Sequence, residues 1–596
     1  MAIDTQITVS LDGTIFKNII DFSLKENVGQ HTKFTVSVRG QSLEDRLNGS
    51  SILESSRVYL GKSFSLEISG LEGFGYEKFY FKGTITQVRG KKGNEEGGMG
   101  DIIDVVGYSN SILLDDGPHM NSFLEKSLSD IILETTGVYS NSNIKVVTAP
   151  ENDSTVSYAV QNKQSTFAYL QYLAASHGEY LLYNSDRLYF GKPTIGEEVV
   201  LKYGFDLKDF SLGLETQSLN FDYYSNDYFS ESTSQASGSS MSSGASGYTA
   251  MVTNASNEVY PESNQQLFST FEDASLQQRL DTAVGLQKKI AEQNQVTLYG
   301  ESVNTGVSLG KIINIKSNEG SFGTYRVTKV NHSYGIRGKY KNAFTAVPLE
   351  IDVYPLTDIS IVNKAQAQIA KVIDTADPEG MSRVQVQFPW QLATGVTTPW
   401  IRVATPYAGG DRGFHFLPEI GDEVLIGFEN GEVERPFMQA ALYTGQNKHG
   451  GWQSNNNNFK GITTKGGHII ELNDTEGEET ITITDKNSNT IRIDTINNNI
   501  EISAIENLTL NAKNIELNAN EEINLNAGTN MNTRVTDDLS VTAKNSQEML
   551  EENKTLVAKE ILKNAEKVRI ESTKDNMELV SSKMVDIQAS DKVKLF

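Results

Sequence analysis

Cysteine is absent from all 596 residues of the chain. Disulfide bonds are therefore excluded, and so are zinc sites that are built on thiolates. The chain has only seven histidines, and no two of them stand at the HExxH spacing of a zinc-binding helix. We expect no metal and no cofactor, and we expect a fold that is compatible with a reducing cytoplasm.

Basic residues are in deficit. The sequence has 52 Lys and Arg against 76 Asp and Glu, which gives a formal net charge of −24. Nucleic-acid binding needs clustered basic side chains that neutralise phosphates. This balance argues against DNA or RNA as the main partner.

Long apolar runs are also missing, since no window approaches the roughly 20 residues of a membrane-spanning helix. The start of the chain, MAIDTQITVSLDG, lacks a basic segment followed by an apolar one, so we expect no secretory signal peptide. If the protein leaves the cell, a dedicated machine has to carry it.

Familiar catalytic motifs are missing as well. The sequence contains neither a GxSxG nucleophile elbow nor a Walker phosphate loop. Carboxylates are numerous, but no sequence feature selects a pair for glycosidase chemistry. We expect a protein that is not an enzyme and has no catalytic residues.

The C-terminal region, in contrast, carries a clear repeat of apolar pairs. Each pair has one polar residue between its members, and the pairs recur about every eight residues. Such members point to the same face of a strand, because side chains alternate with period two. We expect the core of this region to contain Ile500, Ile502, Leu508, Leu510, Ile515, Leu517, Ile523, Leu525, Val585 and Ile587.

Two apolar residues per eight make a thin core that one short strand cannot bury alone. Three intertwined chains, each contributing one face of a prism, bury such pairs and close the strand edges. We therefore predict a homotrimeric β-helix over residues 447–596, with a monomeric β-solenoid as the alternative. Residues 545–567 have helix-like spacing, so either a continuous β-helix or a helical insert fits there.

Residues 1–200 alternate like β-strands and contain two helical patterns. We expect helices at Asn121–Thr136 and Ser165–His177, and a hairpin from Tyr180 to Phe190. The expected strands of the first part are Ile7–Leu11, Phe34–Val38, Phe64–Ile68, Phe79–Val88 and Ile102–Val106.

Residues 201–370 are predicted to be a second β-rich unit that contains one long helix at Ala274–Gln293. The Ser- and Gly-rich stretch Glu231–Gly247 is predicted to be a flexible loop. The expected strands of this unit are Val296–Tyr299, Ile312–Ile315, Tyr325–Val330 and Ala343–Pro348.

Residues 371–446 have short strands and Gly-bounded turns, which are typical of a small OB-fold barrel. Its expected strands are Val384–Phe388, Trp400–Val403, Glu423–Phe428 and Pro436–Ala440.

The motifs FPW, WIRV, PEIGDEV, FENG and ERP of this region together resemble the OB domain of VgrG, the trimeric spike family of type VI secretion systems. The residues that carry the resemblance are Phe388, Pro389, Trp390, Trp400, Pro418, Gly421, Asp422, Glu423, Arg435 and Pro436.

This resemblance implies a mainly β fold with two N-terminal β-barrel-type domains and a few helices, an OB-fold barrel and a C-terminal trimeric β-prism. It implies a trimer that docks on a hexameric, Hcp-like tube protein and on baseplate proteins. It further implies assembly in the cytoplasm at the baseplate, followed by secretion or injection. Effectors and a PAAR-type cap protein would be its cargo, and a target membrane would be punctured mechanically.

The last residues predict where the cap binds. The repeat ends in an apolar pair followed by an aromatic residue, and such an end associates with other surfaces unless it is covered. We expect the cap to bind at Lys592, Val593, Lys594, Leu595 and Phe596.

Three other classes remain open from the sequence. A phage tail or an extracellular contractile particle uses a spike of the same plan. A trimeric β-helical adhesin would need an export signal. A β-helical polysaccharide-acting enzyme would need a groove with basic or paired acidic residues on longer repeats.

Overall fold

A computed structural model describes residues 5–16, 19–39, 56–70, 75–91, 101–140, 142–242, 244–271, 275–318, 320–335 and 339–594. The chain divides into two compact units. The large unit contains Met1–Ile483 and Arg492–Ile500, and the small unit contains Thr484–Ile491 and Glu501–Phe596.

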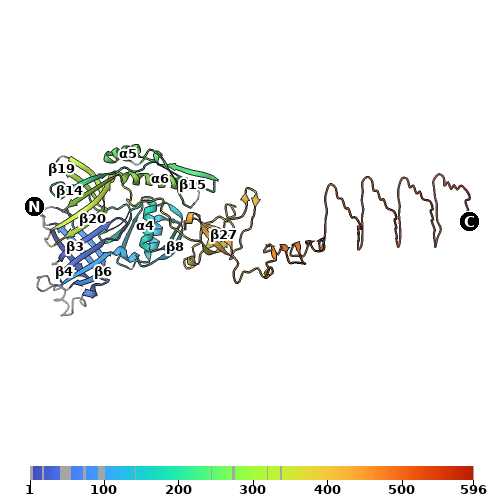
Figure 1. Ribbon diagram of the computed structural model, residues 1–596, viewed down its shortest axis with the longest axis horizontal. Coiled ribbons are helices and arrows are strands. Elements are labelled where there is room, and N and C mark those ends of the chain that lie inside the picture. The colour runs from blue at the N-terminus through green and yellow to red at the C-terminus, as the bar shows by residue number, and fades with distance from the viewer. Residues whose placement is uncertain are drawn as a thin grey trace. The chain divides into compact units, whose positions relative to one another are not determined.

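The large unit contains a thirteen-stranded sheet, counted over the described residues; Figure 1 labels several of its strands near the N-terminus. The strand order is β14-β18-β21-β20-β3-β4-β7-β6-β5-β1-β2, and β19 pairs with both β13 and β20. The strands are β1 (Thr5–Leu11), β2 (Thr14–Phe16), β3 (Ile19–Asn27), β4 (Lys33–Arg39), β5 (Ser63–Gly70), β6 (Phe79–Lys91), β7 (Ile102–Ser109), β13 (Val199–Lys202), β14 (Leu207–Leu214), β18 (Val296–Ser302), β19 (Ile312–Ser317), β20 (Gly320–Tyr334) and β21 (Tyr340–Pro348).

The strands predicted in both N-terminal regions are confirmed, because each overlaps a strand of this sheet. These strands were predictable because apolar and polar residues alternate along them. In β7, for example, every second residue is buried in the core. The sheet contains strands from both sides of residue 200 and joins them where β3 pairs with β20. The domain boundary at that residue stays a prediction.

The helix predicted at Asn121–Thr136 is wrong in its first half. Residues His119–Ser127 form strand β8, which pairs with β10 (Thr155–Gln164), and helix α3 (Leu128–Gly137) begins only after them. Ser127 ends the strand and starts the helix, because its hydroxyl accepts a hydrogen bond from the Asp130 amide at 3.1 Å.

The second predicted helix is confirmed as α4 (Thr166–His177). The Ser165 hydroxyl caps its start by accepting from the Ala168 amide, and Gly178 ends it in the left-handed conformation at φ 70°. The predicted hairpin is also present, as β11 (Leu181–Asn184) and β12 (Arg187–Gly191), and β12 pairs in parallel with β9 (Lys145–Ala149).

The flexible loop predicted over residues 231–247 is wrong for much of its length. Strand β16 (Ser232–Ser237) pairs with β15 (Phe221–Asp227), which also pairs with β17 (Asn264–Leu267). Ala236 is buried in a cluster with residues of helix α6 (Leu276–Gln293), the predicted long helix. Helix α5 (Gly247–Val259) follows the Ser-rich hairpin.

The OB region contains a four-stranded sheet in the order β23-β22-β26-β27. Its strands are β22 (Gln368–Asp374), β23 (Gln385–Gln387), β26 (Glu423–Phe428) and β27 (Pro436–Ala441), and β24 (Ala408–Gly409) and β25 (Arg412–Gly413) form a separate hairpin. The strand predicted at Trp400–Val403 is wrong, because only Ile401 and Val403 make isolated bridges there.

Six short 3-10 helices join these elements within the described residues: η1 (Arg57–Tyr59), η3 (Asn110–Leu114), η4 (Gly238–Ser240), η5 (Leu349–Ile351), η6 (Pro389–Gln391) and η7 (Glu429–Gly431). The fold is thus mainly β with an OB domain, as predicted.

The repeat region begins with five short strands among the described residues: β28 (Phe459–Thr463), β29 (Ile469–Asn473), β30 (Thr480–Thr484), β31 (Thr490–Asp494) and β32 (Asn499–Ser503). Strands β28 and β29 are antiparallel. Residues 504–594 contain no regular helix or strand, so 545–567 form no helical insert. The trimeric β-helix stays a prediction.

Candidate functional site: the OB junction and the apolar repeat

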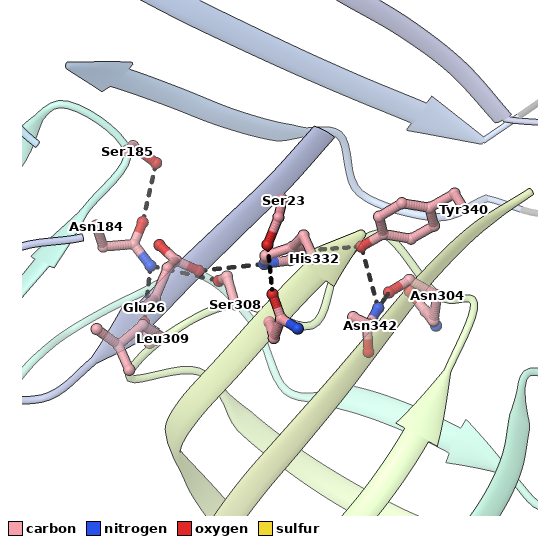
Figure 2. A network of polar contacts seen from close by, with 11 residues as sticks. Ser23, Glu26, Asn184, Ser185, Asn304, Ser308, Leu309, His332, Tyr340 and Asn342 are labelled. Carbon is pink, nitrogen blue, oxygen red and sulfur yellow. Dashed lines mark hydrogen bonds and ion pairs between the residues drawn. The ribbon is translucent and has the colours of Figure 1, made fainter. Parts of the chain in front are cut away.

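A buried polar network lies where β3 meets β20 and joins the two parts of the large sheet. Figure 2 shows His332 between Glu26 and Tyr340, and the side chains of His332 and Glu26 are fully buried. Asn342 donates to the Tyr340 hydroxyl at 3.1 Å, and that hydroxyl is hydrogen-bonded to His332 Nδ1 at 2.7 Å. His332 Nε2 then donates to the Glu26 carboxylate at 3.1 Å. The network fixes the register of this pairing between β3 and β20.

A Ser-His-Asp arrangement is present but cannot act as a hydrolytic triad. His31 contacts the Ser111 hydroxyl through Nδ1 at 2.8 Å and Asp115 through Nε2 at 3.1 Å. The Ser111 side chain is fully buried, and the imidazole stacks on Phe167 at 3.8 Å. Burial lowers the pKa of His31, while Asp115 raises it. Because no substrate reaches Ser111, the group connects η3 to α4 and has no nucleophilic role.

The FPW motif builds the core of the OB domain. Phe388 is almost completely buried, and the Trp390 ring stacks on it at 5.3 Å. Trp390 also donates to Gln368 at 3.0 Å, which ties η6 to β22. Pro389 fits the first position of η6 because a backbone N–H at that position would make no hydrogen bond within the helix. Trp400 is partly buried immediately before the bridge at Ile401.

The PEIGDEV motif forms the turn that leads into β26. Gly421 has φ 93°, a conformation that favours glycine, and its amide donates to Val372 at 2.9 Å. The Asp422 carboxylate accepts from the Glu419 amide at 2.9 Å, and Glu423 begins the strand. Pro418 lies just before the turn and is partly buried. These residues position the backbone of the turn.

The ERP motif attaches the OB domain to the N-terminal part of the large unit. Arg435 forms an ion pair with Glu429 at 2.6 Å and donates to Ser269 at 2.7 Å, a residue beyond β17. Arg402 contacts the other oxygen of Glu429. Pro436 is buried at the start of β27. Proline has no backbone N–H, and the first residue of a strand is a position where this is tolerated.

Glu434 lies at the centre of this junction. Its carboxylate accepts from the Val160 amide of β10 at 3.1 Å and from the Tyr172 hydroxyl of α4 at 3.2 Å. Burial raises the pKa of Glu434 to about 8; the Val160 and Tyr172 hydrogen bonds lower it, and the charge of Glu432 raises it. Burial and the same carboxylate raise the pKa of Tyr172 well above its usual value. Glu434 is therefore a proton-sensitive link between β27, β10 and α4.

The Ser-rich hairpin makes a second contact with the OB domain, which sequence reasoning missed. Arg402 lies 4.6 Å over the Tyr228 ring, and Arg383 lies 5.3 Å over Phe229, both at the hairpin tip. Arg383 is held by a buried, two-pronged ion pair with Asp377, with bonds of 2.7 and 3.0 Å. Burial raises the pKa of Asp377, but the Arg383 bonds outweigh it and lower the pKa to about 2.

The predicted core residues of the repeat are uncovered in the single chain. The ten side chains from Ile500 to Ile587 are between 50% and 71% exposed. At the tip, Lys592, Val593 and Lys594 are exposed, while Leu595 and Phe596 lie outside the described residues. The structure brings the OB motif residues together in one domain. It leaves the repeat core without a covering partner in the chain itself.

Neither metal chemistry nor a membrane-spanning helix is evident in the part of the chain that the structure describes. That part has no cluster of three or more His, Asp or Glu side chains suited to a metal ion. None of its helices is long and apolar enough to cross a bilayer.

Residues 368–443 match the family model of the type VI secretion system/phage-baseplate injector OB domain. The type VI secretion system spike protein VgrG2a of Pseudomonas aeruginosa is 36% identical over 88 residues, which cover 14% of this chain and 10% of that protein. In this region the chain is similar to VgrG spike proteins. The resemblance inferred from the OB motifs is thereby confirmed.

Two further comparisons extend this likeness. The spike protein VgrG5 of the same organism is 31% identical over 119 residues, which cover 19% of this chain and 15% of that protein. A solved Francisella PdpA-VgrG complex covers 84% of this chain and 88% of the matched chain, with a TM-score of 0.54 at 9% identity. The sequence matches thus span about a tenth to a seventh of the VgrG relatives, and the structural match shows the fold.

Proposed function

We propose that this chain is the non-enzymatic, homotrimeric spike of a contractile injection machine of the type VI secretion kind. The observation that carries the proposal is the VgrG-like OB domain followed directly by an apolar repeat that a single chain leaves exposed. The OB domain supports a machine of this class, and the exposed apolar repeat supports an assembly of several chains.

The trimer follows from the energetics of the repeat. Each of the ten core side chains keeps at least half of its surface in water. Covering that remainder contributes roughly 1 kcal/mol per side chain, or on the order of 10 kcal/mol per chain. Three copies wound together supply the cover and pair the strand edges of β28–β32 as well. The result is a stiff prism that transmits force.

The two ends of the spike have different partners in this proposal. The large unit, with its thirteen-stranded sheet, docks on a hexameric, Hcp-like tube protein and on baseplate proteins, since three copies form a threefold ring that is compatible with a sixfold one. The tip at Lys592–Phe596 carries a PAAR-type cap with its effectors. The spike is assembled in the cytoplasm and leaves by sheath contraction through the target membrane.

A second candidate is the spike of a phage tail or of an extracellular contractile particle. The matched family includes phage-baseplate injectors by its description, and the OB geometry is common to both kinds. The two candidates differ in the machine that fires the spike.

Deleting the gene in the producing strain tests the proposal. We expect the tube protein to disappear from the culture supernatant of the deletion strain. In the undeleted strain we expect this chain in the supernatant only while the sheath is intact. Unchanged release of the tube protein contradicts the proposed role. Release of intact particles after cell lysis, with no dependence on a cell-anchored sheath, identifies the phage or particle candidate.

A further inference from the structure

A cavity of about 230 Å³ lies beside the OB junction, and the spike role does not use it. Helices α4 and α6, the start of β10 and the turn before β27 form its walls. Asn152, Ser275 and Gln278 line it and are exposed, whereas Tyr158 and Glu432 line it and are buried. The cavity therefore leads from the surface to a buried polar end.

Two carboxylates stand at that buried end. Glu432 is only 5% exposed, and within the described part of the chain no group donates a hydrogen bond to its Oε2 atom. Glu434 lines the same cavity, and its two oxygens accept from Val160 and Tyr172. A buried carboxylate oxygen without a donor costs free energy, which a bound cation would recover.

The other residues that line the cavity indicate which kind of cation would fit. Leu286, Ile359 and Ile361 provide apolar contact along the way to the carboxylates. Arg279 of α6 also lines the cavity, but its guanidinium donates to Ser275 at 2.7 Å and to the Phe271 carbonyl. Burial lowers the pKa of His177 of α4, so this imidazole adds no positive charge near neutral pH.

We propose that this cavity binds an alkylammonium group, from a small aliphatic amine or a lysine side chain, with the ammonium on Glu432 and Glu434 and the methylenes along the apolar wall. An ammonium brings three donors and a charge, and charge-assisted hydrogen bonds to carboxylates are the strong ones. A metal ion finds no three-ligand cluster among the described residues. The proposal is independent of the spike role, since it needs only the folded large unit.

Binding of the amine depends on the protonation of Glu434. Glu434 holds a proton near neutral pH because burial raises its pKa to about 8, and burial also raises the pKa of Glu432. An ammonium binds after that proton leaves. The other titratable groups that line the cavity are Tyr158 of β10, Tyr172 and His177 of α4, and Arg279 of α6, and the charges of Arg435 and Glu429 also act on Glu432. None of them gains charge on going from pH 6 to pH 8, so affinity for the amine rises over this window.

Calorimetric titration of the full-length protein with n-hexylamine tests the proposal. We expect n-hexylamine to bind, and hexan-1-ol of the same shape to bind at least about tenfold more weakly. Glu432→Gln is expected to weaken amine binding by about tenfold or more, whereas Glu258→Gln, at an exposed carboxylate on α5, leaves it unchanged. The peptide acetyl-Gly-Gly-Lys-Gly-Gly-amide separates the sources: its binding assigns the site to lysine side chains, and binding of hexylamine alone assigns it to small amines.

Three results would overturn the proposal. These are no binding of either amine at about 10 mM, equal binding of hexan-1-ol, and undiminished binding to Glu432→Gln. Should that variant not fold, the unmodified protein still decides, because its affinity for hexylamine must rise from pH 6 to pH 8. A flat or falling affinity over that window refutes the site.

Discussion

Replacing Glu434 by glutamine tests how the OB domain is held on β10 and α4. In the folded chain, burial raises the pKa of this carboxyl from 4.5 to about 8. Between these values the folded state keeps a proton that the unfolded state has lost, so the free energy of unfolding falls as pH rises. The stabilisation is fully present below about pH 4.5 and is lost as pH rises through about 8.

The size of the effect follows from the same two values. At roughly 1.4 kcal/mol per pH unit, a difference between 4.5 and about 8 amounts to at most about 5 kcal/mol per chain. Part of Glu434 is exposed, so the measured loss will be smaller. Glutamine keeps an oxygen for the Val160 amide but carries no titratable proton. We therefore expect Glu434→Gln to remove most of the pH dependence of this junction.

Urea unfolding followed by tryptophan fluorescence measures the effect, because Trp390 packs against the cluster of Tyr158, Val160 and Val433 at this junction. The unmodified chain should lose stability between about pH 5 and about pH 8.5, and Glu434→Gln should lose clearly less. Glu258→Gln is the control for a carboxylate on the surface. Equal slopes for Glu434→Gln and the unmodified chain refute the reasoning.

Three further predictions concern the sheet, the repeat and the tip. His332→Ala leaves the buried Glu26 carboxylate without its donor and should cost about 3–5 kcal/mol in urea unfolding, with strong coupling to Glu26→Ala in a double-mutant cycle; additive costs contradict the network. Ile515→Asn should weaken the trimer by about 2 kcal/mol per chain in sedimentation, while Glu516→Asn on the other face leaves it intact; equal effects contradict the predicted face. Deletion of Lys592–Phe596 should abolish binding of the cap protein in a pull-down without changing the mass of the spike, and unchanged binding contradicts the tip assignment.

Local patterns account for the elements that the sequence predicted well. The alternation of β7 is readable because one of its faces meets the core. Helix α4 is readable because Phe167, Leu170 and Leu173 recur at helical spacing, although most of the helix is buried. The helix prediction at Asn121–Thr136 is wrong in its first half because Phe123 and Leu124 belong to strand β8. The partner of this strand, β10, begins only at Thr155. The flexible loop predicted at Glu231–Gly247 is wrong because the Ser-rich composition hides the pairing of β16 with β15. In β16 only Ala236 is both apolar and buried.

The site could be predicted in part. The OB motifs gave the domain. Of the predicted apolar pairs, Ile500 and Ile502 lie in strand β32, whereas the later pairs lie in residues without a regular strand. The role of Glu434 was not readable, because its donors Val160 and Tyr172 come from more than 260 residues earlier in the chain. The cavity beside Glu432 was hidden for the same reason, since α4, α6 and the OB turn meet only in the fold.

The mass of the purified full-length protein in solution tests the central claim most directly. Light scattering coupled to gel filtration should give three times the mass of one chain, because in the proposed trimer the partner chains cover apolar pairs that the single chain leaves exposed. A protein with the mass of a single chain, whose repeat side chains are nevertheless protected from solvent, would contradict the account.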